Sequence, residues 1–263
     1  MLRKLRTAQD SIRDEASASQ DTPANSTVLT YIIVAQARTG STMLADRLRL
    51  AGLGTPYEYL HPQMMNLLWH RLGPKSARID LQEYMDIVRL NRTTTDGVFG
   101  IKCLYTQLLR QLGKPTAIRE FILSFDRILL LNRRNKLAQA ISAVRAEQTG
   151  RWTSQLASTD GAQATYDPLA VSERIHRFIA QDRELAAMKL AEARTVLRFT
   201  YEELTNSPNQ IWANIERFLG ANPGSLSVAT AVLQRQRDTL SKNWEQQYLA
   251  FLKDGHNMHS DGT

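Results

Sequence analysis

The stretch LTYIIVAQ at residues 29–36, followed directly by ARTGST at residues 37–42, decides the fold class of this chain. The first part is short, almost entirely apolar and rich in β-branched residues, which is typical of a strand buried on both faces. The second part contains Gly40, which permits a tight backbone turn. A helical pattern follows, with apolar positions at Met43, Leu44, Leu48 and Leu50. A strand, a turn and a helix in this order predict the start of a parallel α/β sheet.

Strands and helices alternate along the rest of the chain. We expect further strands at residues 97–104, 127–132 and 195–200. We expect helices at residues 81–91, 136–148, 172–192 and 209–219. This alternation predicts right-handed crossovers and therefore a three-layer α/β fold, in which helices flank a central parallel sheet.

The composition excludes several classes of protein. No apolar run in the 263 residues approaches the roughly 20 residues that cross a bilayer, so a membrane-spanning segment is not expected. Cys103 is the only cysteine, which excludes a disulfide-built scaffold, and we expect its thiol to be buried. The excess of 33 Lys and Arg over 26 Asp and Glu is spread along the chain, without the interleaved aromatic residues of a nucleic-acid motif. We therefore expect no nucleic-acid partner.

The two ends differ in composition from the rest of the chain. We expect residues 1–27 to form a mobile N-terminal segment, residues 28–252 the folded domain, and residues 253–263 a disordered tail. The N-terminal segment lacks the apolar core of a secretory signal, which favours a cytoplasmic location. An alternative is a short basic amphipathic helix at residues 1–12 that contacts a membrane surface.

The turn after the first strand has the features of an anion site. Backbone N–H groups and the positive end of a helix meet at Gly40, where Thr39, Ser41 and Thr42 add hydroxyl groups and Arg38 adds a cation. The chain has no Gly-Lys-Ser/Thr sequence, which disfavours magnesium-dependent hydrolysis of a nucleoside triphosphate. The alternative is an ordinary turn between a strand and a helix.

A second strand-to-helix unit follows at residues 129–152. Arg133 and Arg134 come at the carboxyl end of its strand, where α/β proteins bind ligands, and Ser142 follows in the helix. An arginine and a serine placed in this way can bind a second phosphate through charge-assisted hydrogen bonds. The alternative is a solvated basic helix surface.

Both units resemble parts of the sulfotransferases. The sequence RTGST at residues 38–42 is similar to their 5′-phosphosulfate loop, and the pair Arg133 and Ser142 is similar to their 3′-phosphate site. The string from Gln139 to Trp152 resembles a narrower group, the bacterial trehalose 2-sulfotransferase family, which has the nodulation-factor sulfotransferases as relatives. Further similar segments occur in order at residues 56–59 (PYEY), 98–102 (VFGIK), 201–204 (YEEL), 218–220 (FLG) and 235–244.

The resemblance implies a P-loop-like fold and a donor, 3′-phosphoadenosine 5′-phosphosulfate (PAPS). It implies an acceptor hydroxyl on a carbohydrate or glycolipid, in-line displacement and no required metal. His256 and His259 in the tail have no neighbouring Cys or acidic cluster, which also argues against a metal site. The implied donor-binding residues are Arg38, Thr39, Gly40, Ser41, Thr42, Arg133, Arg134, Ser142 and Arg235. The alternative function is a P-loop-like nucleotide-binding protein or a kinase-type phosphotransferase.

Three residues are predicted to carry the chemistry. By analogy with the family, Glu58 is the general base; a structural salt bridge or an acceptor contact is the alternative, and His61 is the rival base. Arg38 would stabilise the charge that builds on the leaving phosphate oxygen. Lys102, at the end of an apolar strand, would contact the sulfate or the acceptor, or simply close that end of the sheet.

The acceptor site is the least defined part of the prediction. Trp152 would stack on a sugar or adenine ring, or else pack in the core. The family is often dimeric, so a homodimer is implied, although the sequence contains no heptad pattern. The predicted acceptor-binding residues are Glu58, Tyr59, His61, Gln107, Gln148 and Trp152.

Overall fold

The computed structural model falls into two compact units, which we describe separately. The first, called the sheet unit, comprises residues 9–134 and 183–232, and the second, called the helical unit, comprises residues 1–8, 135–182 and 233–263. The residues that the structure describes are 7–22, 26–74, 78–153, 163–190, 195–228 and 239–260.

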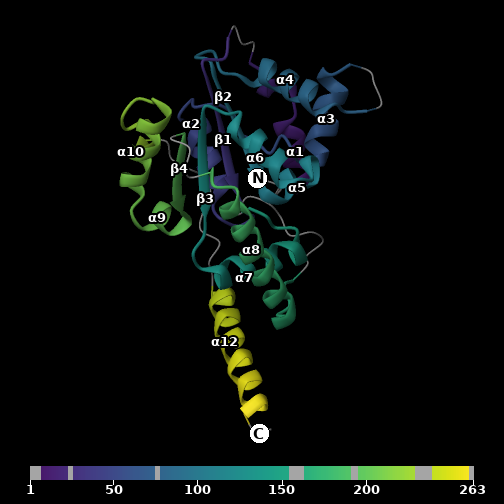
Figure 1. Cartoon of the computed structure of the whole chain (residues 1–263), viewed down its shortest axis with the longest axis vertical. Helices are drawn as coiled ribbons and strands as arrows, with labels where there is room; N and C mark the ends of the chain where they lie inside the picture. Colours follow the sequence, from purple (N-terminus) through teal and green to yellow (C-terminus); the bar gives the residue numbers. More distant parts are fainter. Residues whose placement is uncertain are drawn as a thin grey trace, which may run out of the picture. The chain divides into compact units, whose positions relative to one another are not determined.

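The sheet unit is built on four parallel strands in the order β2-β1-β3-β4 (Figure 1). Their bounds are β1 Leu29–Ala35, β2 Val98–Leu104, β3 Arg127–Asn132 and β4 Val196–Thr200. This confirms the expected parallel sheet. Because β2 and β3 pair with opposite edges of β1, the strand order reverses at β1. In α/β folds, ligands bind beside the carboxyl ends of the strands at such a switch point.

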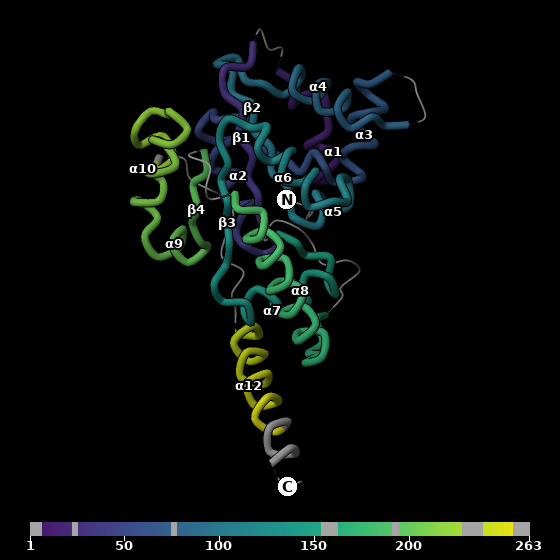
Figure 2. Tube along the Cα trace, viewed as in Figure 1, coloured from purple at the N-terminus to yellow at the C-terminus, as the bar shows by residue number. Residues whose placement is uncertain are grey.

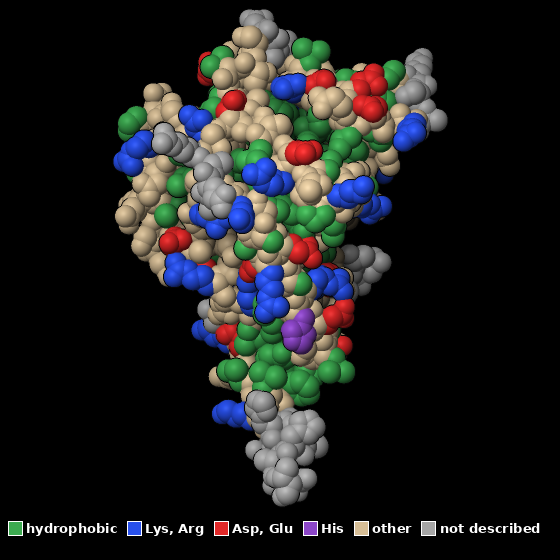
Figure 3. All heavy atoms as spheres, in the orientation of Figure 1, with side chains coloured by type: hydrophobic (Ala, Val, Ile, Leu, Met, Phe, Trp, Pro, Cys, Tyr) green, Lys and Arg blue, Asp and Glu red, His purple; other side chains and the backbone are tan. Residues whose placement is uncertain are grey.

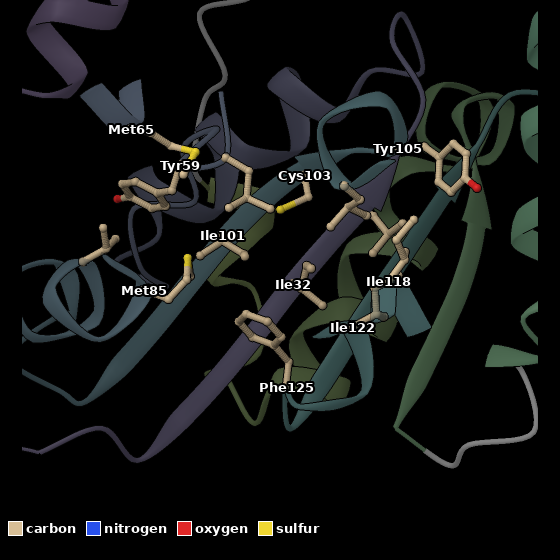
Figure 4. Packing of buried hydrophobic residues seen from close by; sticks show 14 of the residues in the cluster. Ile32, Tyr59, Met65, Met85, Ile101, Cys103, Tyr105, Ile118, Ile122 and Phe125 are labelled. Atoms are coloured by element: carbon tan, nitrogen blue, oxygen red, sulfur yellow. The ribbon is translucent and has the colours of Figure 1, made fainter. Parts of the chain in front are cut away.

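The apolar runs of the strands supply both layers of the core. On one face, alternate residues such as Ile32, Ile101 and Cys103 join one buried cluster, part of which is drawn in Figure 4. On the other face, residues such as Ile33 and Leu129 join a second cluster. Burial on both faces explains why these strands are apolar at nearly every position. The buried position of Cys103 confirms its expected environment.

Helices cover both faces of this sheet (Figures 1 and 2). One face packs against α3 Pro62–Leu72, α4 Leu81–Arg92, α5 Tyr105–Leu112 and α6 Pro115–Leu123. The other face packs against α2 Ser41–Leu50, α9 Tyr201–Asn206, α10 Pro208–Leu219 and α11 Ser225–Val228. The helices predicted at residues 81–91 and 209–219 are therefore present within one residue of their predicted ends.

The helical unit contains α7 Lys136–Thr149, most of α8 Pro168–Ala187, and α12 Thr239–Ser260. The ring of Tyr166 packs edge-on against Trp244 of α12, and the hydroxyls of Ser172 and Tyr248 lie 2.8 Å apart. Towards its C-terminus, α12 exposes apolar side chains, as Figure 3 shows. The helix predicted at residues 136–148 is present. The helix predicted at 172–192 begins and ends earlier than expected.

Both chain ends contain helical structure where the sequence predicted mobility or disorder. Within residues 1–27, α1 Ala8–Glu15 and the 3₁₀-helix η1 Ala18–Gln20 form, and Asp21 makes ion pairs with Arg71 and Arg92 at 2.5 and 3.2 Å. At the other end, α12 extends through Ser260, so it enters the predicted tail. Among the described residues, no helix has both the length and the apolar character that a membrane crossing needs.

The close contact between β1 and β2 generates a prediction about stability. Gly100 of β2 lies under the ring of Tyr31, and a Cβ atom at Gly100 would sit 2.1 Å from Tyr31 Cζ. We expect Gly100→Ala to lower the free energy of unfolding by about 1–3 kcal/mol through overpacking, as measured by urea denaturation. A double variant that also carries Tyr31→Leu should lose less than the sum of the two single losses. Additive losses would contradict this account.

Candidate active site

The loop between β1 and α2 has a constrained backbone. Arg38 and Gly40 both have positive φ angles, 63° and 84°, and such angles are uncommon for a residue with a side chain. The Thr39 hydroxyl donates to the Gln36 carbonyl at 2.9 Å, which closes the turn. A Cβ atom at Gly40 would lie 2.8 Å from the Tyr201 ring, so this position requires glycine for both its angle and its space. The loop therefore leads into the free N–H groups of the first turn of α2 in a fixed geometry.

Arg133 joins this loop to the ends of the neighbouring strands. Its Nη1 donates to the Arg38 carbonyl at 2.9 Å, and its guanidinium carbon lies 4.5 Å from the centre of the Tyr201 ring. The adjacent Arg134 points elsewhere: its Nη2 lies 3.3 Å from Glu203, and its N–H donates to Glu202 at 3.0 Å. Of the two arginines, the structure places Arg133 at the predicted anion loop.

Lys102 and Glu58 form the charged centre of the site. The Lys102 Nζ lies 2.9 Å from Glu58 Oε1 and 3.0 Å from Thr42 Oγ1. The lysine side chain is only 6% exposed, whereas that of Glu58 is 26% exposed. The Lys102 N–H also donates to the Tyr57 carbonyl at 3.0 Å, so the segment that carries Glu58 lies along the edge of β2. The structure thus brings together three predicted residues: Thr42 of the first turn of α2, Lys102 of β2, and Glu58 of the segment between α2 and α3.

Gln107 lies next to Glu58 and contacts its carboxylate. Its side-chain oxygen accepts from the Leu104 N–H at 3.1 Å, which closes the first turn of α5. This orients its Nε2 towards Glu58 Oε2, to which it donates. Gln107 therefore holds the Glu58 carboxylate in place, and its predicted contact with the acceptor stays a prediction. The glutamine at the third position of a helix is the sequence signal for such a cap.

The surroundings of Glu58 keep its carboxylate ionised. Burial raises its pKa, but the charge of Lys102, hydrogen bonds from Lys102 and Gln107, and the nearby His61 together outweigh burial, so the pKa lies below its usual value of 4.5. At neutral pH Glu58 can therefore accept a proton. Its favourable contribution to folding is present above pH 4.5 and is lost as the pH falls through the lowered pKa.

Tyr59 and His61, two predicted site residues close to Glu58 in the sequence, have different environments in the structure. Tyr59 is fully buried, its hydroxyl donates to the Thr55 carbonyl at 2.7 Å, and its ring stacks on Phe99. Tyr59 is therefore a core residue, which corrects its assignment as an acceptor contact. His61 is the N-cap residue of α3 and is close enough to Glu58 to lower its pKa. Its role as a rival base stays a prediction.

The other predicted residues belong to the helical unit or are not described. Ser142 lies in α7. Gln148 exchanges two hydrogen bonds with the backbone of Thr165, and Trp152 is 38% exposed. Arg235 lies outside the described residues, as does most of the polar stretch before α8. Their roles stay predictions from the sequence.

Metal-ligating side chains do not gather in the part of the chain that the structure describes. No group of three or more His, Cys, Asp or Glu residues there could hold a metal ion. The side chains of His256 and His259 are outside the described set.

A protein-family model matches most of this chain. The model described as Stf0 sulphotransferase matches residues 30–250, which include β1, the loop, Glu58, Lys102 and Arg133. The chain belongs to this sulfotransferase family. The resemblance to trehalose 2-sulfotransferases and the expectation of an enzyme are thereby confirmed. A kinase-type phosphotransferase is not favoured.

Two curated relatives and a solved structure are similar to this chain. The chain is 26% identical over 251 residues to a trehalose 2-sulfotransferase of Mycolicibacterium smegmatis, covering 83% of this chain and 93% of the relative. A trehalose 2-sulfotransferase of Mycobacterium tuberculosis is 26% identical over 255 residues, with 84% and 94% covered. Among solved structures, a sulfotransferase from Alicyclobacillus acidocaldarius is similar with a TM-score of 0.45 and 14% identity, covering 85% of this chain and 91% of that one.

The contact between Lys102 and Glu58 generates a prediction about proton affinity. Lys102→Met removes both the charge and the hydrogen bond that lower the pKa of Glu58, so burial should dominate and raise that pKa above 4.5. Titration of the Glu58 carboxyl carbon by ¹³C NMR would measure the change. Lys114→Met, at an exposed position, is the control and should leave the titration unchanged. A Glu58 pKa that stays below 4.5 in Lys102→Met would show that Lys102 is not the cause.

Proposed function

We propose that this sulfotransferase moves a sulfuryl group from PAPS to a hydroxyl group of a carbohydrate or glycolipid. The observation that carries the proposal is the triad of Glu58, Lys102 and Thr42, in which one ammonium group contacts both a carboxylate and the anion loop. The relatives named trehalose 2-sulfotransferase support a carbohydrate acceptor. A homodimer, a cytoplasmic location and a membrane contact through residues 1–12 stay predictions from the sequence.

The proposed chemistry is an in-line displacement at sulfur. The acceptor oxygen forms a bond to sulfur, while the bond between sulfur and the phosphate oxygen breaks and its electron pair leaves with the phosphate. Glu58 takes the proton of the acceptor hydroxyl, since its carboxylate is ionised at neutral pH. In this proposal Arg38, the loop N–H groups and Lys102 stabilise the negative charge that grows on the leaving oxygen, since preorganised charges stabilise a transition state.

In this scheme Lys102 affects both the charge and the base strength of Glu58. Its contact with Glu58 keeps the base ionised, but the same contact makes the carboxylate a weaker base by lowering its pKa. An anionic donor at the loop would compete for the ammonium group, which already contacts Thr42 in the first turn of α2. As Lys102 shifts its charge towards the donor, the proton affinity of Glu58 would rise, so that the base becomes stronger when the donor is present.

Arg133 is the proposed ligand of the 3′-phosphate of the donor, and Ser142 stays a proposed ligand from the sequence alone. The place of Arg133 beside the Arg38 carbonyl supports this choice over Arg134, which is held by Glu202 and Glu203. Arg235 stays a proposed donor contact from the sequence alone.

The direct test is transfer of radiolabelled sulfate from PAPS to a panel of acceptors. Trehalose, other glucose-containing disaccharides and glycolipids would be incubated with the enzyme in the presence of EDTA, and products identified by mass spectrometry. We expect a sulfate ester on at least one carbohydrate, with activity that the chelator does not abolish. Absence of transfer to every carbohydrate on the panel would contradict the proposal.

The variant Glu58→Gln tests whether Glu58 is the general base. We expect turnover to fall by about 10²–10⁴-fold, because the amide cannot accept the proton. Binding of adenosine 3′,5′-bisphosphate, measured by calorimetry, should remain close to that of the wild type. Glu120→Gln on the exposed side of α6 is a matched control. Unchanged turnover in Glu58→Gln would reassign the base to another residue, with His61 as the first candidate.

The variant Arg133→Ala tests whether Arg133 binds the 3′-phosphate of the donor. We expect its affinity for adenosine 3′,5′-bisphosphate to fall about tenfold or more, because a charge-assisted hydrogen bond is lost. Its affinity for adenosine 5′-monophosphate, which lacks the 3′-phosphate, should fall much less. Arg134→Ala is the comparison variant and should change this ratio less. Equal losses for both nucleotides in Arg133→Ala would move the 3′-phosphate site elsewhere.

A further inference from the structure

The segment of residues 7–22 precedes the part of the chain that the family model matches, which starts at residue 30. Residues 9–22 are nevertheless part of the sheet unit, in which polar contacts hold them. Arg71 Nε donates to the Ala16 carbonyl at 3.0 Å, and the fully buried Arg92 donates to the Ser17 carbonyl at 3.3 Å. Asp21 adds ion pairs to both arginines. These contacts hold α1 and η1 in a defined place next to α3 and α4.

The same segment also reaches the part of the site that carries the base. The Tyr57 hydroxyl donates to the side-chain oxygen of Gln20 at 2.9 Å, and the Tyr57 carbonyl accepts from the Lys102 N–H. Tyr57 is the residue before Glu58. The Gln20 side chain therefore contacts the residue that directly precedes Glu58 and whose carbonyl accepts a hydrogen bond from Lys102.

Glu15 of α1 is a charged residue on which Lys102 and Glu58 act electrostatically. Ile12 packs against the core and Ala16 is buried in it, one turn apart, and Glu15 lies beside that apolar stripe with its Oε1 accepting from Ser11 at 3.2 Å. Its carboxyl group is partly buried and interacts electrostatically with Lys102 and Glu58. Within the described part of the chain Glu15 makes no ion pair, because the ammonium group of Lys102 contacts Glu58 and Thr42 instead.

A partly buried carboxylate of this kind is costly unless it gains hydrogen bonds. Carbohydrate hydroxyls are donors that could supply them, and an acceptor hydroxyl must approach Glu58 for its proton to be removed. We propose that Glu15 is a further acceptor-binding residue, whose carboxylate accepts hydrogen bonds from hydroxyl groups of the carbohydrate held against Glu58. The proposal rests on the proposed function and assigns part of the acceptor site to a segment that lies before the matched family region.

The ionisation of Glu15 gives the proposal a distinctive pH signature. Burial raises the pKa of Glu15 to about 7, although the charge of Lys102 opposes the shift. The carboxylate therefore predominates only above pH 7, and acceptor affinity should weaken as the pH falls through that value. Four charged or titratable groups act on Glu15 or lie beside it. They are Lys102 of β2, Tyr57 and Glu58 of the segment between α2 and α3, and Asp46 of α2.

The test compares Glu15→Gln with Asp14→Asn, a matched change at an exposed position of the same helix. Steady-state kinetics would be measured with PAPS and trehalose, or with the best carbohydrate on the acceptor panel. We expect Glu15→Gln to raise the KM for the acceptor about tenfold, with little change in the KM for PAPS. The rise of acceptor KM below pH 7 should disappear in Glu15→Gln but remain in Asp14→Asn. The Tm at pH 8 should not fall, since the substitution removes a partly buried charge.

Two results would overturn the assignment. One is an acceptor KM and pH profile in Glu15→Gln that match those of Asp14→Asn. The other is an equal rise in the KM values for acceptor and PAPS, which would indicate a structural effect. If the wild type transfers sulfate to carbohydrate, either result removes Glu15 alone from the site. If the wild type transfers none, the proposed function fails and the role of Glu15 fails with it.

Discussion

The contact of one buried ammonium group with two partners organises the candidate active site of this sulfotransferase. Lys102 is almost completely removed from water, and a charge in that position is stable only if it is paired and hydrogen-bonded. Glu58 supplies the opposite charge and Thr42 supplies a hydroxyl oxygen. The need to satisfy this one cation therefore links the edge strand β2, the first turn of α2 and the segment that carries Glu58. Gln107 then completes the arrangement by holding the second carboxylate oxygen.

The sheet topology explains why these groups can meet. The strand order reverses at β1, so the loop after β1 lies between the ends of β2 and β3. Lys102 reaches this loop from β2, and Arg133 reaches it from β3. Tyr201, at the end of β4, fills the space above Gly40 and supports the Arg133 guanidinium. The carboxyl ends of all four strands thus contribute to one rigid edge, on which a small anionic group can be recognised.

Much of this architecture could be predicted from local sequence, because central parallel strands need continuous apolar runs and a glycine turn marks the anion loop. The partners of individual polar residues could not. Gln107 carries the local signal of a helix cap, but its second partner, Glu58, is distant in the chain and is set by tertiary packing. Tyr59 adjoins Glu58 in sequence yet points into the core, a distinction that a resemblance between short motifs does not contain. Helices α3 and α6 were not predicted, although each begins with a proline, which is a local start signal.

Cys103 directly follows Lys102 in β2, but its thiol is buried and takes no part in the candidate site. Successive residues of a strand face opposite sides of the sheet, so the thiol is fully enclosed in the core layer while its neighbour points to the site. Burial raises the pKa of Cys103 well above its usual value, which leaves it in the unreactive protonated form. An oxidant or alkylating reagent can reach this sulfur only if the strand opens. The sole cysteine of the chain therefore reports on the integrity of the sheet, and its labelling rate would follow opening of the sheet rather than events in the active site.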